Sequence, residues 1–333
     1  MRQLIIIFGM LVAGSVNAQD PHFSQFFSSP LTLNPALTGK FFGSYRISGN
    51  YRNQWPTLNN AFTTATASVD FQAFKNKIAN NDTWGLGAMA YNDNSAAGAV
   101  KFNYFSASTA YHKGLDEDGQ HQLSAGFQVT YANMLVNTSL LTFEDQLTTS
   151  GFIGLTSEIF SSSTLNANYV DFNAGLLYNG STNDRNNFYL GLSMYHINRP
   201  VQKFSGAAYN LTPRVNFHAG GYFPIGEITS IHLSGLQMYQ GGYSETMIGG
   251  ALQFNANPND IKSTSLYVGT WFRFNDAIIP YAGLEFGDYR LGISYDYNAQ
   301  LIRTATQNRG GIEVSLIYIR RPSTDRPVNC PKF

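Results

Sequence analysis

The chain has 333 residues, and its 21 Lys and Arg residues balance 21 Asp and Glu residues. Only 13% of the residues are charged, roughly half the share of an average soluble domain, whereas 14% are aromatic. The balanced charge provides no basic surface for nucleic acid, and the single cysteine, Cys330, excludes a disulfide framework within the chain.

Residues 1–18 are predicted to form a secretory signal peptide. Arg2 precedes an apolar stretch at 4–12, and the small-residue sequence Val16-Asn17-Ala18 closes the segment. We expect cleavage after Ala18, so that Gln19 begins the mature chain. The apolar stretch is too short for a membrane-spanning helix, and no later segment reaches the roughly 18 apolar residues that such a helix needs.

Residues 19–43 are predicted to form an arm that belongs to no strand. Proline follows Asp20, Ser29 and Asn34, and each proline lacks an N–H group and holds the preceding residue in extended or turn geometry. Such a segment cannot face lipid, where every unpaired backbone group is costly. Its apolar side chains would not remain in water, so we expect the arm to act as a plug inside the protein or to contact a periplasmic partner. The residues predicted for this contact are Phe23, Phe26, Phe27, Pro30, Leu33, Asn34 and Pro35.

The remainder of the chain alternates between apolar and small or polar residues. In QLSAGFQVTY, for example, Leu123, Phe127 and Tyr131 fall on one face, and Ser124 and Gln128 fall on the other. This period of two is typical of a wall between lipid and a polar lumen. Fourteen such segments are predicted, at 44–52, 61–71, 83–91, 102–111, 122–133, 169–178, 187–195, 215–224, 231–239, 245–254, 265–274, 278–286, 289–297 and 309–319.

These segments predict an all-β fold, a transmembrane antiparallel up-and-down β-barrel over 44–319 in the outer membrane, with 320–333 as a periplasmic tail. An even number of strands places both chain ends on the periplasmic side. The connections after odd-numbered strands then face outward and should be the long ones. The two longest gaps, 134–168 and 196–214, follow the fifth and seventh segments, as this orientation requires.

The alternation directs charged side chains of both signs toward the lumen. Closure of the barrel would bring the first strand beside the last, so we expect these side chains to form a hydrogen-bonded ion network. Buried ion pairs destabilise a protein unless their partners are satisfied. The network would either stiffen the wall and hold the plug, or line a polar track for a peptide. Its predicted members are Arg46, Arg52, Arg273, Glu285, Arg290, Asp296 and Glu313.

No arrangement of residues indicates catalysis or a cofactor. The six histidines are scattered and lie in no nucleophile, zinc or metalloprotease motif. Asn92, Asp93 and Asn94 offer oxygen ligands but lack the bidentate glutamate and the spacing of a calcium loop. We therefore expect no catalytic, cofactor-binding or metal site, and no enzyme.

Motifs near both ends of the chain carry a resemblance to a known family. The arm DPHFSQFFSSPLTLNPALTG is followed by YRISGNYRNQW, and the later part contains WFRFNDAIIPYAGLEFGDYRLGISYDYN, GGIEVSLIY and the ending NCPKF. On these motifs the chain resembles the PorP/SprF-type membrane proteins of the type IX secretion system of Bacteroidetes. The likeness spans the mature chain, although about 134–215 matches only in pattern.

The resemblance implies an outer-membrane β-barrel that is needed for secretion or surface attachment of proteins exported by this system. Many family members are thought to serve one cargo, often a large adhesin with a type B C-terminal sorting domain, which in gliding bacteria includes mobile adhesins. One branch works with the core machinery and its periplasmic ring. The implied partners are outer-membrane lipid, the C-terminal domain of the cargo, and the periplasmic ring with its lipoproteins.

Three classes of function compete. The first is non-catalytic docking and secretion of a partner, and the second is passive transport by a porin or a FadL-like channel. FadL-like channels carry an N-terminal Asn-Pro-Ala element comparable to Asn34-Pro35-Ala36. The third class is a structural envelope protein without cargo. A continuous pore or an apolar ligand pocket would favour transport, whereas a blocked lumen with apolar outer loops would favour docking, the class that the resemblance favours.

Overall fold

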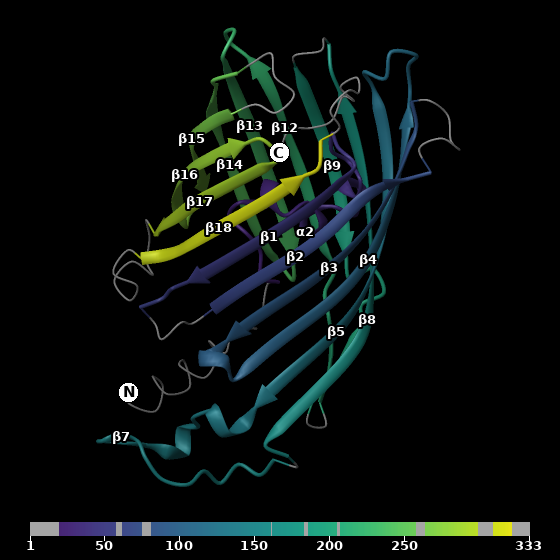
Figure 1. Ribbon diagram of the computed structural model, residues 1–333. Helices are drawn as coiled ribbons and strands as arrows, with labels where there is room; N and C mark the ends of the chain where they lie inside the picture. Colours follow the sequence, from purple (N-terminus) through teal and green to yellow (C-terminus); the bar gives the residue numbers. More distant parts are fainter. Residues whose placement is uncertain are drawn as a thin grey trace, which may run out of the picture.

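The computed structural model describes residues 20–57, 62–74, 81–160, 162–182, 186–204, 207–257, 264–298 and 309–321. The predicted signal peptide, its cleavage position at Ala18 and Gln19, and residues 322–333 lie outside these ranges. The described chain forms a closed barrel of antiparallel strands (Figure 1). Within these ranges, no helix has the length and apolarity that a membrane crossing requires.

Fourteen strands make up the barrel, and each pairs with its neighbours in barrel order until the last strand pairs with the first. They are β1 (Tyr45–Gln54), β2 (Phe62–Ala73), β3 (Thr83–Ser95), β4 (Val100–Gly114), β5 (Gln122–Asn137), β8 (Thr164–Gly180), β9 (Asn187–Tyr195), β12 (Arg214–Pro224), β13 (Thr229–Gln240), β14 (Tyr243–Asn255), β15 (Thr264–Arg273), β16 (Ala277–Phe286), β17 (Tyr289–Asn298) and β18 (Arg309–Ile319). Every predicted segment corresponds to one of these strands, which confirms the predicted fold.

The strand faces show why this sequence closes into a membrane barrel. Along β17, Leu291, Ile293 and Tyr295 are exposed on the outside, whereas Ser294 and Asp296 are buried inside. Closure pairs the edge strands, so that no row of backbone N–H and C=O groups is left facing lipid. The fold therefore defines an outer-membrane β-barrel, as predicted from the alternation.

Several strands extend farther than the alternation predicted, including β3, which ends at Ser95 rather than 91, and β5 and β8 show the reason. β8 begins at Thr164 rather than 169, and β5 continues to Asn137 rather than 133. Their outward side chains here include Asn133 and Asn168, which are hydrogen-bonded to each other at 2.6 Å. Because the outward residues are polar at this level, the apolar-outside pattern used for prediction stops before the strands do.

The long connections lie at one end of the barrel, which is the outer end in the predicted orientation. The β5–β8 connection contains η4 (Thr138–Leu140), η5 (Glu144–Gln146), β6 (Leu147–Thr148) and β7 (Gly151–Phe152). The β9–β12 connection contains the hairpin of β10 (Val201–Phe204) and β11 (Ala207–Asn210), and η3 (Ala96–Gly98) joins β3 to β4.

The N-terminal arm lies inside the barrel (Figure 1, purple). It consists of three short helices, η1 (Phe26–Ser28), α2 (Pro30–Leu33) and η2 (Pro35–Leu37). At the outer end, the Asp20 N–H group donates to Gln240 at the end of β13, and at the other end the Ser44 N–H group donates to the carbonyl of Arg320. The arm therefore runs from the outer end of the lumen to the periplasmic end before β1 begins.

Candidate functional site in the barrel lumen

The outermost residue of the arm is held by a group of charged side chains. The Asp20 carboxylate lies 2.7 Å from His196 Nε2 and 3.2 Å from Arg214, and the other ring nitrogen of His196 lies 3.0 Å from Asp171. His196 follows the last residue of β9. Burial acts to lower its pKa, but the carboxylates of Asp20 and Asp171 raise the pKa to about 9. His196 is therefore positively charged at neutral pH and pairs with both carboxylates.

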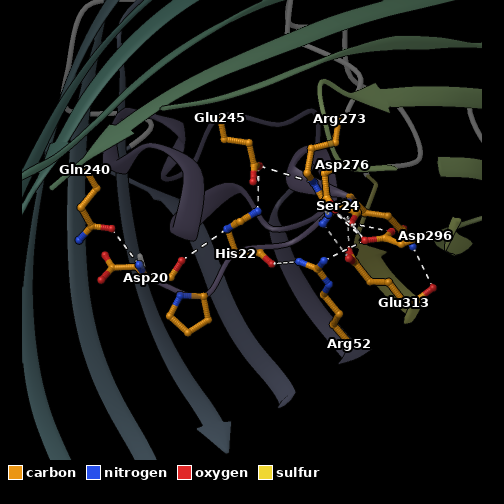
Figure 2. A network of polar contacts seen from close by, with 12 residues as sticks. Asp20, His22, Ser24, Arg52, Gln240, Glu245, Arg273, Asp276, Asp296 and Glu313 are labelled. Carbon is orange, nitrogen blue, oxygen red and sulfur yellow. Dashed lines mark hydrogen bonds and ion pairs between the residues drawn. The ribbon is translucent and has the colours of Figure 1, made fainter. Parts of the chain in front are cut away.

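The next residues of the arm enter a second ionic group, shown in Figure 2. His22 lies 2.8 Å from Glu245, and the backbone carbonyl of His22 accepts a hydrogen bond from Arg52. The Ser24 hydroxyl donates to Asp296 at 2.8 Å. These contacts tie the arm to β14 through Glu245, to β1 through Arg52 and to β17 through Asp296.

Asp296 and Glu313 are the acidic centres of this group. Asp296 lies 2.8 Å from Arg52 and 3.0 Å from Arg273, so one carboxylate joins two guanidinium groups. Glu313 accepts the backbone N–H groups of Ser24 and Gln25 at 2.8 and 2.9 Å. Glu313 therefore fixes the backbone of the arm, whereas Asp296 holds the hydroxyl group of Ser24.

The middle of the arm fills the lumen with apolar groups. Phe27 lies against Trp271, with 4.6 Å between ring centroids, and meets Tyr281 edge to face at 5.4 Å. Phe26 and Leu33 belong to the buried core cluster of the lumen. Burial of such side chains contributes about 1.5–3 kcal/mol each, so this section of the plug is held by packing.

The Asn34-Pro35 turn fits against two glycines of the wall. Asn34 is 0% exposed, its side-chain oxygen accepts the Ala36 N–H group at 2.8 Å, and its amide donates to the carbonyl of Leu176 at 3.0 Å. A Cβ atom at Gly175 would lie 1.9 Å from the Asn34 oxygen, and one at Gly126 would lie 2.3 Å from the backbone nitrogen of Ala36. The absence of side chains at these two wall positions therefore lets the turn approach the strands.

The periplasmic end of the arm is fixed by a further ion pair. Asp70 accepts two hydrogen bonds from Arg46, at 3.0 and 2.7 Å, and one from the Gly39 N–H group at 2.7 Å. Arg46 also donates to the carbonyl of Leu37 at 3.1 Å. The ring of His112 contacts the carbonyl of Thr38 at 2.8 Å.

The seven charged residues predicted for one lumen network fall into three groups. Arg52, Arg273, Asp296 and Glu313 gather near the outer end, whereas Glu285 and Arg290 pair at 2.6 Å near the periplasmic end. Arg321 joins the second group at 2.6 Å from Glu285, and Arg46 forms the third group with Asp70 at 2.7 Å. The groups are separate because inward-facing residues of one strand lie at different heights in the lumen.

The sequence predicted the arm residues as a plug or a partner contact, but it did not indicate several of the charged groups that hold the arm. Phe23, Phe26, Pro30, Leu33, Asn34 and Pro35 are all buried, and Phe27 is partly buried. The missed groups are Asp20 of the arm itself and, on the wall, Asp70, His196, Arg214 and Glu245. Asp70 and Glu245 occupy inward positions of the same alternation, so extending the charge search from the last four strands to all strands would have found them.

Two small cavities border the arm. One has a volume of about 60 Å³ and is lined in part by Asp20, Tyr91 and Arg214, and the other has about 40 Å³ and is lined in part by Phe27 and Trp271. Cavities of this size hold a few water molecules. Across the described ranges, no three His, Cys, Asp or Glu side chains are grouped in a way that could hold a metal ion.

These observations define the class of protein: an outer-membrane β-barrel whose lumen is occupied by its own N-terminal arm. The model of the family described as "Type IX secretion system membrane protein PorP/SprF" matches residues 15–318. The chain belongs to this family, as the motifs at both ends predicted. It is therefore related to membrane components of the type IX secretion system.

Two toluene transporters are among the solved structures with a similar fold. The toluene transporter TbuX of Ralstonia pickettii is 9% identical, with a TM-score of 0.51, and the match covers 88% of this chain and 93% of that one. The toluene transporter TodX of Pseudomonas putida is 10% identical, with a TM-score of 0.50, and 90% and 94% of the two chains are covered. These likenesses show the fold alone. None of the curated proteins compared with the chain matches it.

Proposed function

We propose that this protein is a non-catalytic component of the type IX secretion system that is required for secretion or surface attachment of one exported partner. The expected partner is an adhesin with a type B C-terminal sorting domain, of the kind used in gliding motility. Membership of the family supports the general role. The observation that carries the docking role is the arm, which fills the lumen and is tied to the wall at both ends.

A barrel with such a plug presents surfaces rather than an open passage. Its outer connections are available to a partner at the cell surface, and its periplasmic end is available to the secretion machinery. The periplasmic ring and its lipoproteins are the partners that we propose there. The seven inward charges then serve to fix the wall and the arm, rather than to line a track for a moving peptide.

The contacts of the histidines support a non-catalytic role. His112 and His218 contact the arm at Thr38 and Asn34, and His22 and His196 are engaged in ion pairs. A general base needs a proton donor or a substrate within hydrogen-bond reach. In this lumen the arm occupies the space beside these histidines where a substrate would have to lie.

The competing proposal is passive transport, the activity for which the two similar toluene transporters are named. Ligand pockets usually enclose about 300–1,000 Å³, whereas the cavities beside the arm have volumes of about 60 and 40 Å³. Transport would therefore require the arm to move. Uptake of radiolabelled toluene by cells with and without the gene separates this alternative from docking.

Comparative proteomics of the cell surface and the medium tests the docking proposal. The gene is deleted, and a deletion strain complemented with the intact gene is the control. Loss of one or a few proteins with type IX sorting domains from the surface, restored by complementation, is the expected result. Collapse of the whole type IX secretome would assign the protein to the core machinery instead, and an unchanged secretome would overturn both roles.

A further inference from the structure

The connection between β5 and β8, residues 138–163, has the features of a binding surface; we call it the outer loop. It extends away from the end of the barrel, and β7 marks its position at the bottom of Figure 1. It is therefore clear of the lipid-facing wall, and its side chains are placed among water and neighbouring molecules at the cell surface.

Apolar side chains of the outer loop point away from the protein. Leu155 is 98% exposed and Ile159 is 93% exposed. Others are more than half exposed: Leu140, Leu147, Phe152 and Ile153. Exposed leucines on the barrel wall are covered by lipid, but these residues lie beyond the strands. Contiguous apolar surface in water is uncommon in soluble regions and marks interaction sites.

The same loop is held together by hydrogen bonds between exposed polar groups. The Asp145 carboxylate accepts hydrogen bonds from the hydroxyl groups of Thr156 and Ser157, at 3.0 and 2.9 Å. The Gln146 carbonyl accepts the Ile153 N–H group at 2.9 Å, and the Gln146 side chain donates to the carbonyl of Gly154 at 3.1 Å. Polar groups thus hold the loop together while apolar groups face outward. A preordered surface of this kind loses little conformational entropy when it binds.

The charges of the outer loop indicate the chemistry of its partner. Residues 138–163 contain Glu144, Asp145 and Glu158 but no Lys, Arg or His. Glu144 and Glu158 are exposed beside the apolar side chains. An acidic border disfavours an anionic lipid surface and favours a partner with Lys or Arg around an apolar patch.

We propose that the outer loop is the docking surface for the exported partner, and that it binds a folded domain through an apolar patch bordered by Lys and Arg. This inference rests on the proposed function, because that function supplies the partner. It goes further by assigning the surface, its anchors Leu155 and Ile159, and the charge of the partner domain.

The binding test uses the full-length barrel in detergent and the C-terminal domain of the protein that the deletion strain fails to display. Leu155→Ser and Ile159→Ser should each weaken binding about tenfold or more, because each removes a large side chain from the interface. Glu144→Lys with Glu158→Lys should also weaken binding, and should remove the decrease in affinity that added salt causes for the wild type. Val201→Ser with Tyr209→Ser, exposed positions of the other outer connection, is the matched control and should bind like the wild type.

Unchanged affinity in the serine variants would overturn the docking surface, even where the deletion strain loses its cargo and the proposed function stands. A photo-crosslinking amino acid at position 155 in intact cells gives an independent readout. Crosslinking to the displayed protein supports the inference. Crosslinking to lipid alone, or to a second copy of this chain, would overturn it.

Discussion

Replacing Asp296 tests whether the outer ionic group holds the arm in the barrel. The carboxylate is only 4% exposed and lies within 3.0 Å of both Arg52 and Arg273, while also accepting from Ser24. Asp296→Ala would leave two buried guanidinium groups without their shared partner. Removing one member of a buried ion pair costs about 3–5 kcal/mol, so we expect a loss of this size in the free energy of unfolding.

Asp276 provides the matched control because it also pairs with Arg273, at 2.8 Å, but its side chain is 36% exposed. Exposed pairs contribute about 0–1 kcal/mol, so Asp276→Ala should cost less than about 1 kcal/mol. Urea unfolding of the barrel in lipid vesicles, followed by tryptophan fluorescence and by protease cleavage of the arm, measures both variants. Equal losses for the two, or a loss below about 1 kcal/mol for Asp296→Ala, would refute the reasoning.

Three further predictions concern the arm. Deleting 19–37 should leave a folded, heat-modifiable barrel that no longer displays cargo, and loss of the barrel itself would show that the arm is needed for folding. Burial acts to raise the pKa of Asp20, but His196 and Arg214 hold it below its usual range, and the pKa of His196 is about 9. The ion pair between Asp20 and His196 should therefore stabilise the arm fully between about pH 4 and 6.5. That stabilisation should fall as the pH rises through about 9, so that proteolysis of the arm becomes faster. The variant His196→Gln should not show this increase in proteolysis at alkaline pH. Gly126→Ala places a Cβ atom 2.3 Å from the arm backbone and should expose the arm to protease. Gly49→Ala, whose Cβ atom would lie 3.8 Å from its nearest neighbour, should not. Equal protection of the arm in both variants would contradict the inference that Gly126 lets the arm approach the wall.

The strands and the arm were predictable because their signals are local. Period-two alternation is visible within ten residues, and proline at 21, 30 and 35 excludes the arm from a lipid-facing wall. The strand ends at Asn137 and Thr164 were missed because the outward residues change from apolar to polar above the membrane. Local patterns describe a face of a strand, but they do not say where lipid ends.

The partners of the charged residues were not predictable in the same way. Arg46 and Arg52 lie six positions apart on β1 and face the same lumen, yet Arg46 meets Asp70 and Arg52 meets Asp296. Their partners depend on height along the lumen, which the register of every intervening strand determines. The outer loop was missed for a different reason: its apolar residues follow no period, and only the absence of basic residues from 138–163 distinguishes it in the sequence.

The position of the outer ionic group has a consequence for the order of assembly. Arg52 and Glu313 are register partners across the seam between β1 and β18, and Ser24 bonds to Glu313 across 289 residues of chain. Contacts between residues so distant in sequence can form only after the chain between them has closed into a loop. Ser24 can bond to Glu313 only after β18 has entered the barrel, whereas Asp20 meets His196 and Arg214 on earlier parts of the wall. Although the arm precedes every strand in the chain, its contacts with Glu313 form only once the last strand is in place.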